Sequence, residues 1–260
     1  MIDTHCHLTD PRLQSQLDDV LARAAANGVT RMVTIGTDFD DARNAIALCK
    51  RLPNVRCAVG VHPNYTQNVE LSDLPMLREI QADPVVLALG EMGLDYFHHF
   101  APREKQFAVF EFQLQLATEL GRPVVIHSRE ATDDTLAVMK NFPAVRAVFH
   151  CFTGSRDEAR KILDTGYLLG FTGPITFKKS DELREVVRMT PEDRLLVETD
   201  SPYLTPEPMR KQKTNEPGFV KHVAEEVGRI KGWTLKQTDE ITTANAERFY
   251  GWAEEVKSEK

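Results

Sequence analysis

The repeating pattern of this 260-residue chain is clearest at residues 124–150, VVIHSREATDDTLAVMKNFPAVRAVFH. A short apolar run ends in His127, a helical pattern follows at 132–141, and a second apolar run ends in His150. Short runs rich in β-branched residues predict strands, whereas apolar residues at helical spacing predict an amphipathic helix. We therefore expect residues 124–150 to form a strand, a helix and a second strand.

The same alternation extends in both directions from this segment. Strands are predicted to begin near Ile2, Arg31, Arg56, Val85, Val124, Ala147, Tyr167 and Leu195. Helices are predicted at 12–27, 40–51, 71–82, 103–120, 132–141, 155–164, 180–190, 218–231 and 235–250. A capping box of Ser155 and Glu158 marks the start of the sixth helix.

Eight strand–helix units in about 250 residues are typical of a single α/β (β/α)8 TIM barrel. A doubly wound open sheet is the alternative, but its first turn is usually rich in glycine. Here the first strand is followed by HLTDP, which contains no glycine. We expect one barrel domain over residues 1–252 and a charged C-terminal tail at 253–260.

Composition excludes disordered, collagen-like and coiled-coil chains, because 42% of the residues are hydrophobic and 27% are charged. The formal net charge of −7 argues against a protein that holds nucleic acid by bulk charge. No apolar run exceeds five residues, as at 85–89, so we expect no membrane span. The chain opens on MIDTHCH and has four scattered cysteines. From these features we expect no signal peptide, reduced core thiols and a cytoplasmic location.

Five of the eight histidines fall at the ends of predicted strands, namely His5, His7, His62, His127 and His150. Carboxylates follow two further strands, at Glu91 and Asp200. His5 and His7 share one face of their strand because side chains alternate. A lone histidine after a strand is usually structural. Several that converge on the C-terminal mouth of one barrel favour a metal site, since barrel active sites lie there.

Six of these side chains are the candidate metal ligands: His5, His7, Glu91, His127, His150 and Asp200. Six ligands exceed what one ion with an open position needs, and they suit two divalent ions bridged by a carboxylate. Imidazole and carboxylate ligands are compatible with Mg²⁺, Mn²⁺, Zn²⁺ or Ni²⁺, so the identity of the metal stays open.

The chain resembles the TatD family of metal-dependent hydrolases and deoxyribonucleases over nearly its whole length. The segments that carry the resemblance are IDTHCH (2–7), GVHP (60–63), GEMGLDY (90–96), PVVIHSREATDD (123–134), HCFTGS (150–155), LLVETDSPYL (195–204), NEP (215–217) and TTANAERFYG (242–251). The resemblance implies one metal held by His5, His7, Glu91 and Asp200. It implies a second held by Glu91, His127 and His150, with Glu91 as the bridge. Thr9 and Asn64 depart from the usual family motifs, which affects expected substrate contacts rather than metal ligands.

The resemblance implies a deoxyribonuclease that cleaves phosphodiester bonds with a metal-activated hydroxide. Asp200 is the candidate general base, and Glu91 is the second candidate catalytic residue. His62 and Arg129 are candidates to contact the substrate phosphates. Three cations of the long loop 201–218, Arg210, Lys211 and Lys213, are candidates to follow a nucleic-acid backbone, with a solvated loop as the alternative.

Other functions remain compatible with the sequence. The same chemistry would hydrolyse another ester, an amide or a phosphotriester, including an aminoacyl-tRNA ester. A non-enzymatic barrel with a structural metal is the remaining alternative. The expected partner is DNA as substrate, no obligate protein partner is evident, and the oligomeric state stays open. Tyr96, Phe97 and Phe100 either stack on bases or pack their loop onto the barrel.

Overall fold

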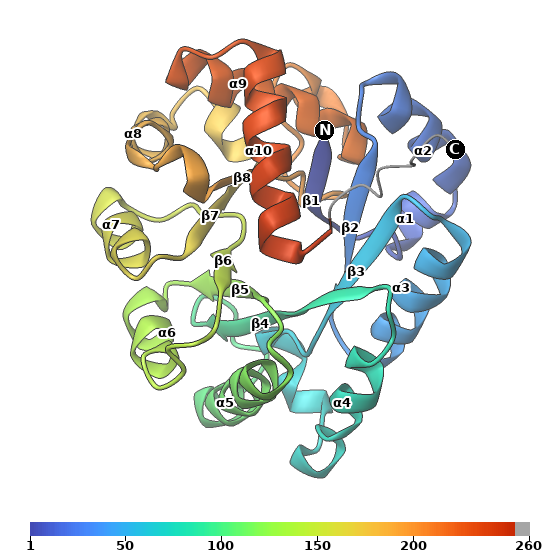
Figure 1. Ribbon diagram of the computed structural model, residues 1–260, viewed down its shortest axis with the longest axis vertical. Coiled ribbons are helices and arrows are strands. Elements are labelled where there is room, and N and C mark those ends of the chain that lie inside the picture. Colours follow the sequence, from blue (N-terminus) through green and yellow to red (C-terminus); the bar gives the residue numbers. More distant parts are fainter. Residues whose placement is uncertain (253–260) are drawn as a thin grey trace, which may run out of the picture.

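The eight predicted apolar runs form eight parallel strands in the computed structural model, which describes residues 1–252 (Figure 1). The strands are β1 (Ile2–Cys6), β2 (Arg31–Gly36), β3 (Val55–Val59), β4 (Val86–Asp95), β5 (Val124–Arg129), β6 (Ala147–Phe149), β7 (Leu168–Phe171) and β8 (Leu195–Val197). Each begins within one residue of its predicted start. The predicted tail at 253–260 lies outside the described residues.

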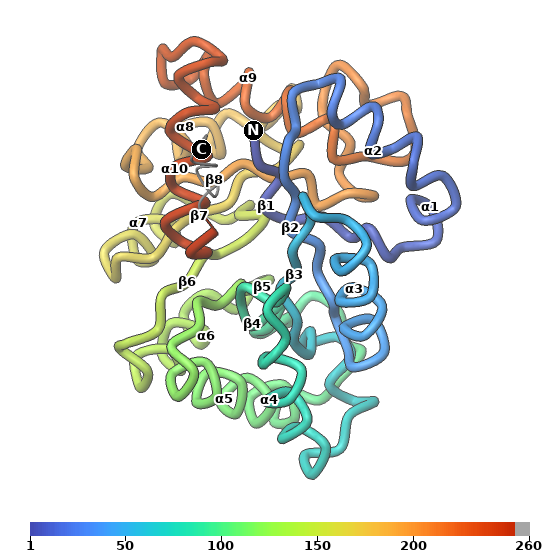
Figure 2. Tube along the Cα trace, turned by 45° about the vertical axis from the view of Figure 1, so that its right-hand side comes forward, coloured from blue at the N-terminus to red at the C-terminus, as the bar shows by residue number. Residues whose placement is uncertain are grey.

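Helices alternate with these strands and surround them (Figures 1 and 2). They are α1 (Pro11–Gln14), α2 (Leu17–Ala26), α3 (Phe39–Arg51), α4 (Met76–Gln81), α5 (Arg103–Leu120), α6 (Thr132–Met139), α7 (Arg156–Asp164), α8 (Asp181–Met189), α9 (Val220–Lys231) and α10 (Leu235–Tyr250). The 3-10 turns are η1 (Pro63–Asn68), η2 (Leu71–Asp73), η3 (Gly173–Thr176), η4 (Glu192–Arg194), η5 (Met209–Lys211) and η6 (Pro217–Phe219). The predicted capping box of Ser155 and Glu158 is present at the start of α7.

Two predicted helices are interrupted. The helix expected at 12–27 divides into α1 and α2, because Gln16 has a non-helical backbone with φ −138° and ψ 33°. The helix expected at 71–82 consists of η2 followed by α4, and Pro75 stands directly before α4. Proline has no N–H to donate to a preceding turn, so a helix starts more readily after it than through it.

The strands follow one another in sequence order around the sheet, from β1 to β8. The seam between β8 and β1 is closed largely by side chains and loop backbone. Thr4 Oγ1 donates to Val197 O at 3.0 Å, and the Asp3 carboxylate accepts from Thr199 N at 2.9 Å and Thr199 Oγ1 at 2.6 Å. Asp200 N donates to His5 O at 2.9 Å. His7 N donates to Ser201 O at 2.7 Å, so the closing contacts also fix the chain on both sides of Asp200.

Two apolar clusters make up the core. The larger lies between the barrel and its helices and includes Cys6, as strand alternation predicts. The smaller fills the barrel and continues into Phe249 and Tyr250 of α10, which crosses in front of β1 and β8 (Figure 1). Tyr250 also donates its hydroxyl hydrogen to Thr4 O at 3.1 Å. Within residues 1–252, no helix combines the length and apolar character needed to cross a membrane.

Strand β4 differs most from its prediction, because it continues past Glu91 to Asp95. Its pairing with β5 shifts register between Leu89 and Met92. Irregularities of this kind re-aim side chains next to functional sites. Gly90, just before Glu91, has φ +129°, and a Cβ there would lie 2.5 Å from Val125 O. Only glycine fits this approach of β4 to β5, which presents Glu91 to the mouth of the barrel.

Candidate metal centre

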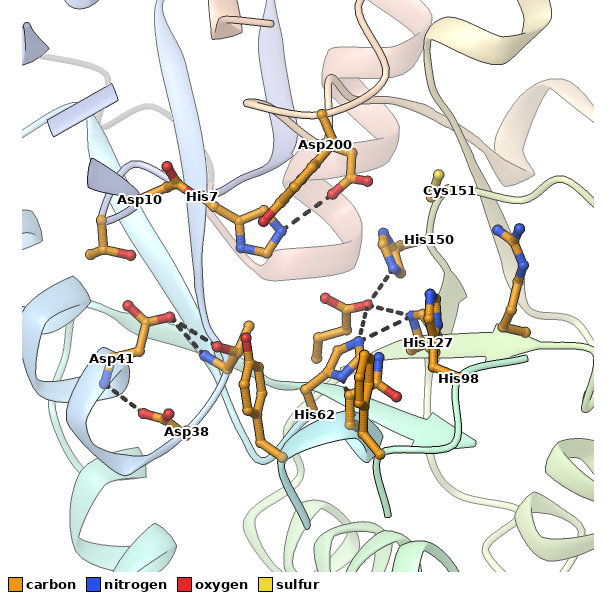
Figure 3. Close-up of a pocket in the computed structure, with 18 of the residues that line it drawn as sticks. His7, Asp10, Asp38, Asp41, His62, His98, His127, His150, Cys151 and Asp200 are labelled. Carbon is orange, nitrogen blue, oxygen red and sulfur yellow. Dashed lines mark hydrogen bonds and ion pairs between the residues drawn. The ribbon is translucent and has the colours of Figure 1, made fainter. Parts of the chain in front are cut away.

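A cavity of about 830 Å³ opens at the carboxyl ends of the strands (Figure 3). Its lining includes five of the six predicted ligands: His7, Glu91, His127, His150 and Asp200. The sixth, His5, is completely buried beneath them. The predicted ligands, which come from β1, β4, β5, β6 and the loop after β8, are therefore brought together in one place.

Glu91 lies at the centre of the histidines. Its Oε1 is 2.5 Å from His150 Nε2 and 2.8 Å from His127 Nδ1, while its Oε2 is 3.5 Å from His5 Nε2. The carboxylate is buried, with 3% of the residue exposed. One carboxylate therefore has imidazoles from three strands around its two oxygens, as expected for a bridging ligand.

Asp200 forms the other side of the group. Its Oδ1 is 3.2 Å from His7 Nε2 and 3.7 Å from His5 Nε2. Its backbone lies in the left-handed region, at φ +55°, which is uncommon for a residue other than glycine and recurs at functional sites. The His5 ring stacks on the His150 ring at 3.9 Å between centroids, so it connects the Asp200 side with the Glu91 side.

The buried nitrogens of this group fit a metal centre. Both ring nitrogens of His5 and Nδ1 of His150 are buried without a hydrogen-bond partner among residues 1–252. Buried polar atoms normally have a partner, so orphaned imidazole nitrogens indicate a ligand-binding role. Three sets of side chains have ligand atoms within 4.8 Å of one another: His5, His7 and Asp200; His5, Glu91 and His150; His62, Glu91 and His127. Two of these sets share Glu91.

The protonation states of Glu91, Asp200 and His5 suit metal ligands as well. Burial by itself raises the pKa of Glu91, but the charges of His150 and His62 and hydrogen bonds from histidines hold it well below its ordinary value. Burial also opposes ionisation of Asp200, yet the hydrogen bond from His7 lowers the pKa of that carboxyl. Burial lowers the pKa of His5 and so favours its neutral ring. Ionised carboxylates and a neutral imidazole are the forms that bind metals.

Two buried carboxylates stand behind the histidines, and the sequence did not assign them a role. Asp95 Oδ2 is 2.9 Å from His127 Nε2, on the far side of the ring from Glu91. Glu198 Oε1 is 3.7 Å from His150 Nδ1 and accepts from Cys151 N at 2.5 Å. A carboxylate that is hydrogen-bonded to an imidazole ligand, as Asp95 is to His127, fixes the ring and its tautomer. Strand periodicity could have identified Asp95, which lies four residues after Glu91 on the same face of β4.

The predicted substrate contacts occupy different positions. His62 lies inside the cluster, with Nε2 3.3 Å from Glu91 Oε1, so it is close enough to be a further ligand. Arg129 is exposed at the rim, and its guanidinium lies 4.9 Å from the centre of the Phe97 ring. Cys151 lines the cavity with Sγ 3.1 Å from Thr172 Oγ1. The prediction that all four cysteines are core thiols was therefore wrong for Cys151.

The three aromatic residues after Glu91 divide between the two predicted roles. Tyr96 donates its hydroxyl hydrogen to Asp134 at 2.7 Å and packs against the core, so it anchors the loop. Phe97 and Phe100 are about half exposed, at 51% and 55%, and Phe100 lines the cavity.

A family model described as TatD related DNase matches residues 2–251. The chain belongs to the TatD family. Its relatives include the protein named uncharacterized metal-dependent hydrolase YabD of Bacillus subtilis, 40% identical over 252 residues, which cover 96% of this chain and 98% of YabD. The protein named 3'-5' ssDNA/RNA exonuclease TatD from Erwinia amylovora is 35% identical and is matched over 96% of this chain and 100% of its own.

Solved TatD structures have the same fold. The TatD homologue YJJV of Escherichia coli K12 superposes with a TM-score of 0.92 at 27% identity, covering 97% of this chain and 98% of that one. An organophosphorus hydrolase superposes with a TM-score of 0.66 at 15% identity, which is a likeness of fold alone. The segments that suggested the TatD family thus lie in a barrel that has the fold of a solved TatD structure over 97% of this chain.

Proposed function

We propose that this protein is a divalent-metal-dependent nuclease that hydrolyses phosphodiester bonds of DNA. The observation that carries the proposal is the cluster around Glu91, in which six predicted ligands meet at the base of an open cavity. Family membership adds support, since relatives carry the names metal-dependent hydrolase and 3'-5' ssDNA/RNA exonuclease. Removal of nucleotides from the 3' end of a single strand is accordingly the first activity to test.

The residues divide between two ions. His5, His7 and Asp200 are proposed to hold one, His127 and His150 the other, and Glu91 both. When bound, divalent ions supply Lewis acidity that polarises a phosphoryl oxygen and lowers the pKa of water. Mg²⁺, Mn²⁺, Zn²⁺ and Ni²⁺ all suit this donor set.

The chain's own groups supply proton transfer and substrate orientation. Asp200 is ionised and lies at the cavity, so we propose that its carboxylate accepts the proton of the attacking water. His7 Nε2 is 3.2 Å from Asp200 Oδ1, so these two proposed ligands of one ion lie side by side. Arg129 at the rim is proposed to bind a substrate phosphate, because its guanidinium is exposed beside the cavity. We also propose a cytoplasmic location, which the four free cysteines support.

The proposal is tested with protein stripped by a chelator and reloaded with Mg²⁺ or Mn²⁺. Labelled single- and double-stranded DNA are assayed beside a panel of small esters, amides and phosphotriesters. We expect cleavage of DNA, lost by at least about a hundredfold in Glu91→Gln and Asp200→Asn. Glu79→Gln, on the exposed side of α4, is the matched control and should retain activity.

Failure of every metal to support cleavage of either DNA form would refute the nuclease proposal. Turnover confined to the small-molecule panel would assign the site to another ester, amide or phosphotriester. A metal that raises the melting temperature without any turnover would indicate a structural role.

A further inference from the structure

The loops after β7 and β8 carry five exposed cations, which we call the cationic surface: Lys178, Lys179, Arg210, Lys211 and Lys213. The ion pairs of this region are made by other residues, Arg184 with Asp181 and Arg23 with Glu216. Within residues 1–252 the cationic surface thus has no ion-pair partners, and its charges are available to an external anion, on a chain whose net charge is −7.

The two loops form a single surface because they are packed against each other. The Arg210 guanidinium lies 3.4 Å from the centre of the Phe177 ring, and Glu207 N donates to Thr176 Oγ1 at 2.9 Å. At Gly173 an added Cβ would lie 2.0 Å from Leu204 O, so only glycine permits this approach. The juxtaposition joins two segments separated by about thirty residues of sequence, and it is invisible in the sequence alone.

Both loops are held at their bases. Asn215 is fully buried and donates from Nδ2 to Thr199 O at 2.9 Å and to Tyr203 O at 2.6 Å. Arg184 donates to Ile175 O at 3.0 Å and Phe177 O at 2.8 Å. The cations therefore project into solvent from loops whose bases are braced.

The loop that carries Arg210, Lys211 and Lys213 starts at the cavity of the metal centre. Tyr203 and Leu204 line that cavity, and only four residues lie between Leu204 and η5, a span of at most about 18 Å of chain. On the side of the cavity formed by the β2–α3 loop lie Asp38 and Asp41 (Figure 3), whose carboxylates accept backbone N–H groups rather than cations. A polyanion that leaves the cavity is repelled there and attracted toward the loops after β7 and β8.

We propose that the cationic surface binds the sugar–phosphate backbone of a single-stranded nucleic acid whose end lies in the metal-centre cavity. This inference rests on the proposed nuclease function and specifies a polymeric substrate. Lysine-rich surfaces bind phosphates without reading the bases. Tyr203 lines the cavity, and its half-exposed ring can stack on an unpaired base.

The test compares Lys178→Gln/Lys179→Gln and Lys211→Gln/Lys213→Gln with Arg51→Gln/Lys140→Gln. The control pair also removes two exposed cations, but from the carboxyl ends of α3 and α6, on the opposite face of the barrel. The substrate is a labelled single-stranded oligonucleotide of about 20 nucleotides. KM, kcat and equilibrium binding by fluorescence anisotropy are measured with Mg²⁺ over a range of salt concentrations.

Each phosphate contact on a single strand contributes about 0.7 to the slope of log affinity against log salt. Loss of one or two contacts is therefore expected to raise KM about 5- to 25-fold near 0.1 M salt and to flatten the slope by about 0.7 to 1.4. The change should fall on KM rather than on kcat, and the control pair should retain the full salt dependence.

The outcomes separate this inference from the proposed function. If all variants cleave DNA with the KM and the salt dependence of the control pair, the proposed role of the cationic surface is wrong and the proposed nuclease function is unaffected. Salt-dependent binding by the wild type that both loop variants weaken, without cleavage, would support the surface and refute the nuclease. Neither binding nor cleavage by the wild type would overturn both.

Discussion

Replacement of Asp95 by asparagine should weaken metal binding while leaving the barrel folded. Asp95 Oδ1 accepts from the backbone N–H groups of Phe97 at 3.0 Å and His98 at 2.8 Å, and asparagine retains this oxygen. Asp95 Oδ2 accepts from His127 Nε2 at 2.9 Å and is 2.9 Å from His98 Nδ1. In Asp95→Asn an NH₂ group takes the place of Oδ2. The substitution therefore removes the acceptor behind His127 and preserves the turn after β4.

The expected loss follows from the charge-assisted hydrogen bond between Asp95 and His127. Such bonds contribute about 1.5–3 kcal/mol, which corresponds to about a 10- to 150-fold change in an equilibrium constant. The lower part of that range agrees with the 10- to 100-fold effects typical of carboxylates behind imidazole ligands. We expect the apparent dissociation constant of the metal that His127 holds to rise by about 10- to 100-fold.

Titration of activity and of melting temperature with Mn²⁺ measures this constant directly. His98→Ala is the matched control, because it removes the other imidazole from the same oxygen without touching His127. Wild-type metal affinity in Asp95→Asn, or an equal loss in His98→Ala, would show that Asp95 stabilises the loop and does not position His127.

Three further predictions concern stability. Gln113 is fully buried, accepts from Val61 N at 2.8 Å and donates to Val61 O at 3.1 Å. Gln113→Leu should therefore lower the unfolding free energy, measured by urea titration, by about 2–4 kcal/mol. Gln115→Leu, at an exposed position of the same helix, is the control and should have little effect. Burial raises the pKa of Glu158, but hydrogen bonds from Ser155 and Thr132 outweigh it and lower the pKa. The ionised Glu158 carboxylate therefore contributes its full stabilisation above the pKa of about 4.3 that it has in the unfolded chain. This stabilisation is lost as the pH falls through the lower pKa of the folded state. The difference in unfolding free energy between wild type and Glu158→Ala should therefore narrow from pH 7 to pH 3. Chelation should lower the melting temperature, and metal at about 100 times its dissociation constant should restore about 2.7 kcal/mol, an effect that Glu91→Gln reduces.

The sequence predicted the strands and the place where the candidate ligands meet, because both depend on local pattern. Each strand is a short apolar run, and each ligand directly follows or ends such a run. The barrel then brings those ends together, so strand order alone was enough to place His127 beside Glu91 and His150. The direction of the side chains needed only the two-residue period of a strand.

Roles that depend on distances across the barrel were not predicted. Glu198 lies behind His150 only because β7 leaves room for it, at Gly170, where a Cβ would be 2.5 Å from Glu198 Oε2. His62 looked like a substrate contact at the end of β3, but the side chain lies within the cluster. In both cases the sequence shows the type of side chain, but the side chains that it contacts depend on the width and register of the closed barrel.

The distribution of charge explains how an acidic protein suits a polyanionic substrate. Two bound divalent ions would change the formal charge from −7 to −3 and place four positive charges at the base of the cavity. Asp38 and Asp41 make one side of the cavity repulsive, and the loops after β7 and β8 make another side attractive. Electrostatic attraction is screened within about 10 Å at ordinary salt concentrations. Only a nucleic-acid strand that reaches the cavity is therefore attracted by both the ions and the cationic surface. Net charge therefore governs how weakly the rest of the molecule binds DNA, and the local arrangement governs where an end can enter.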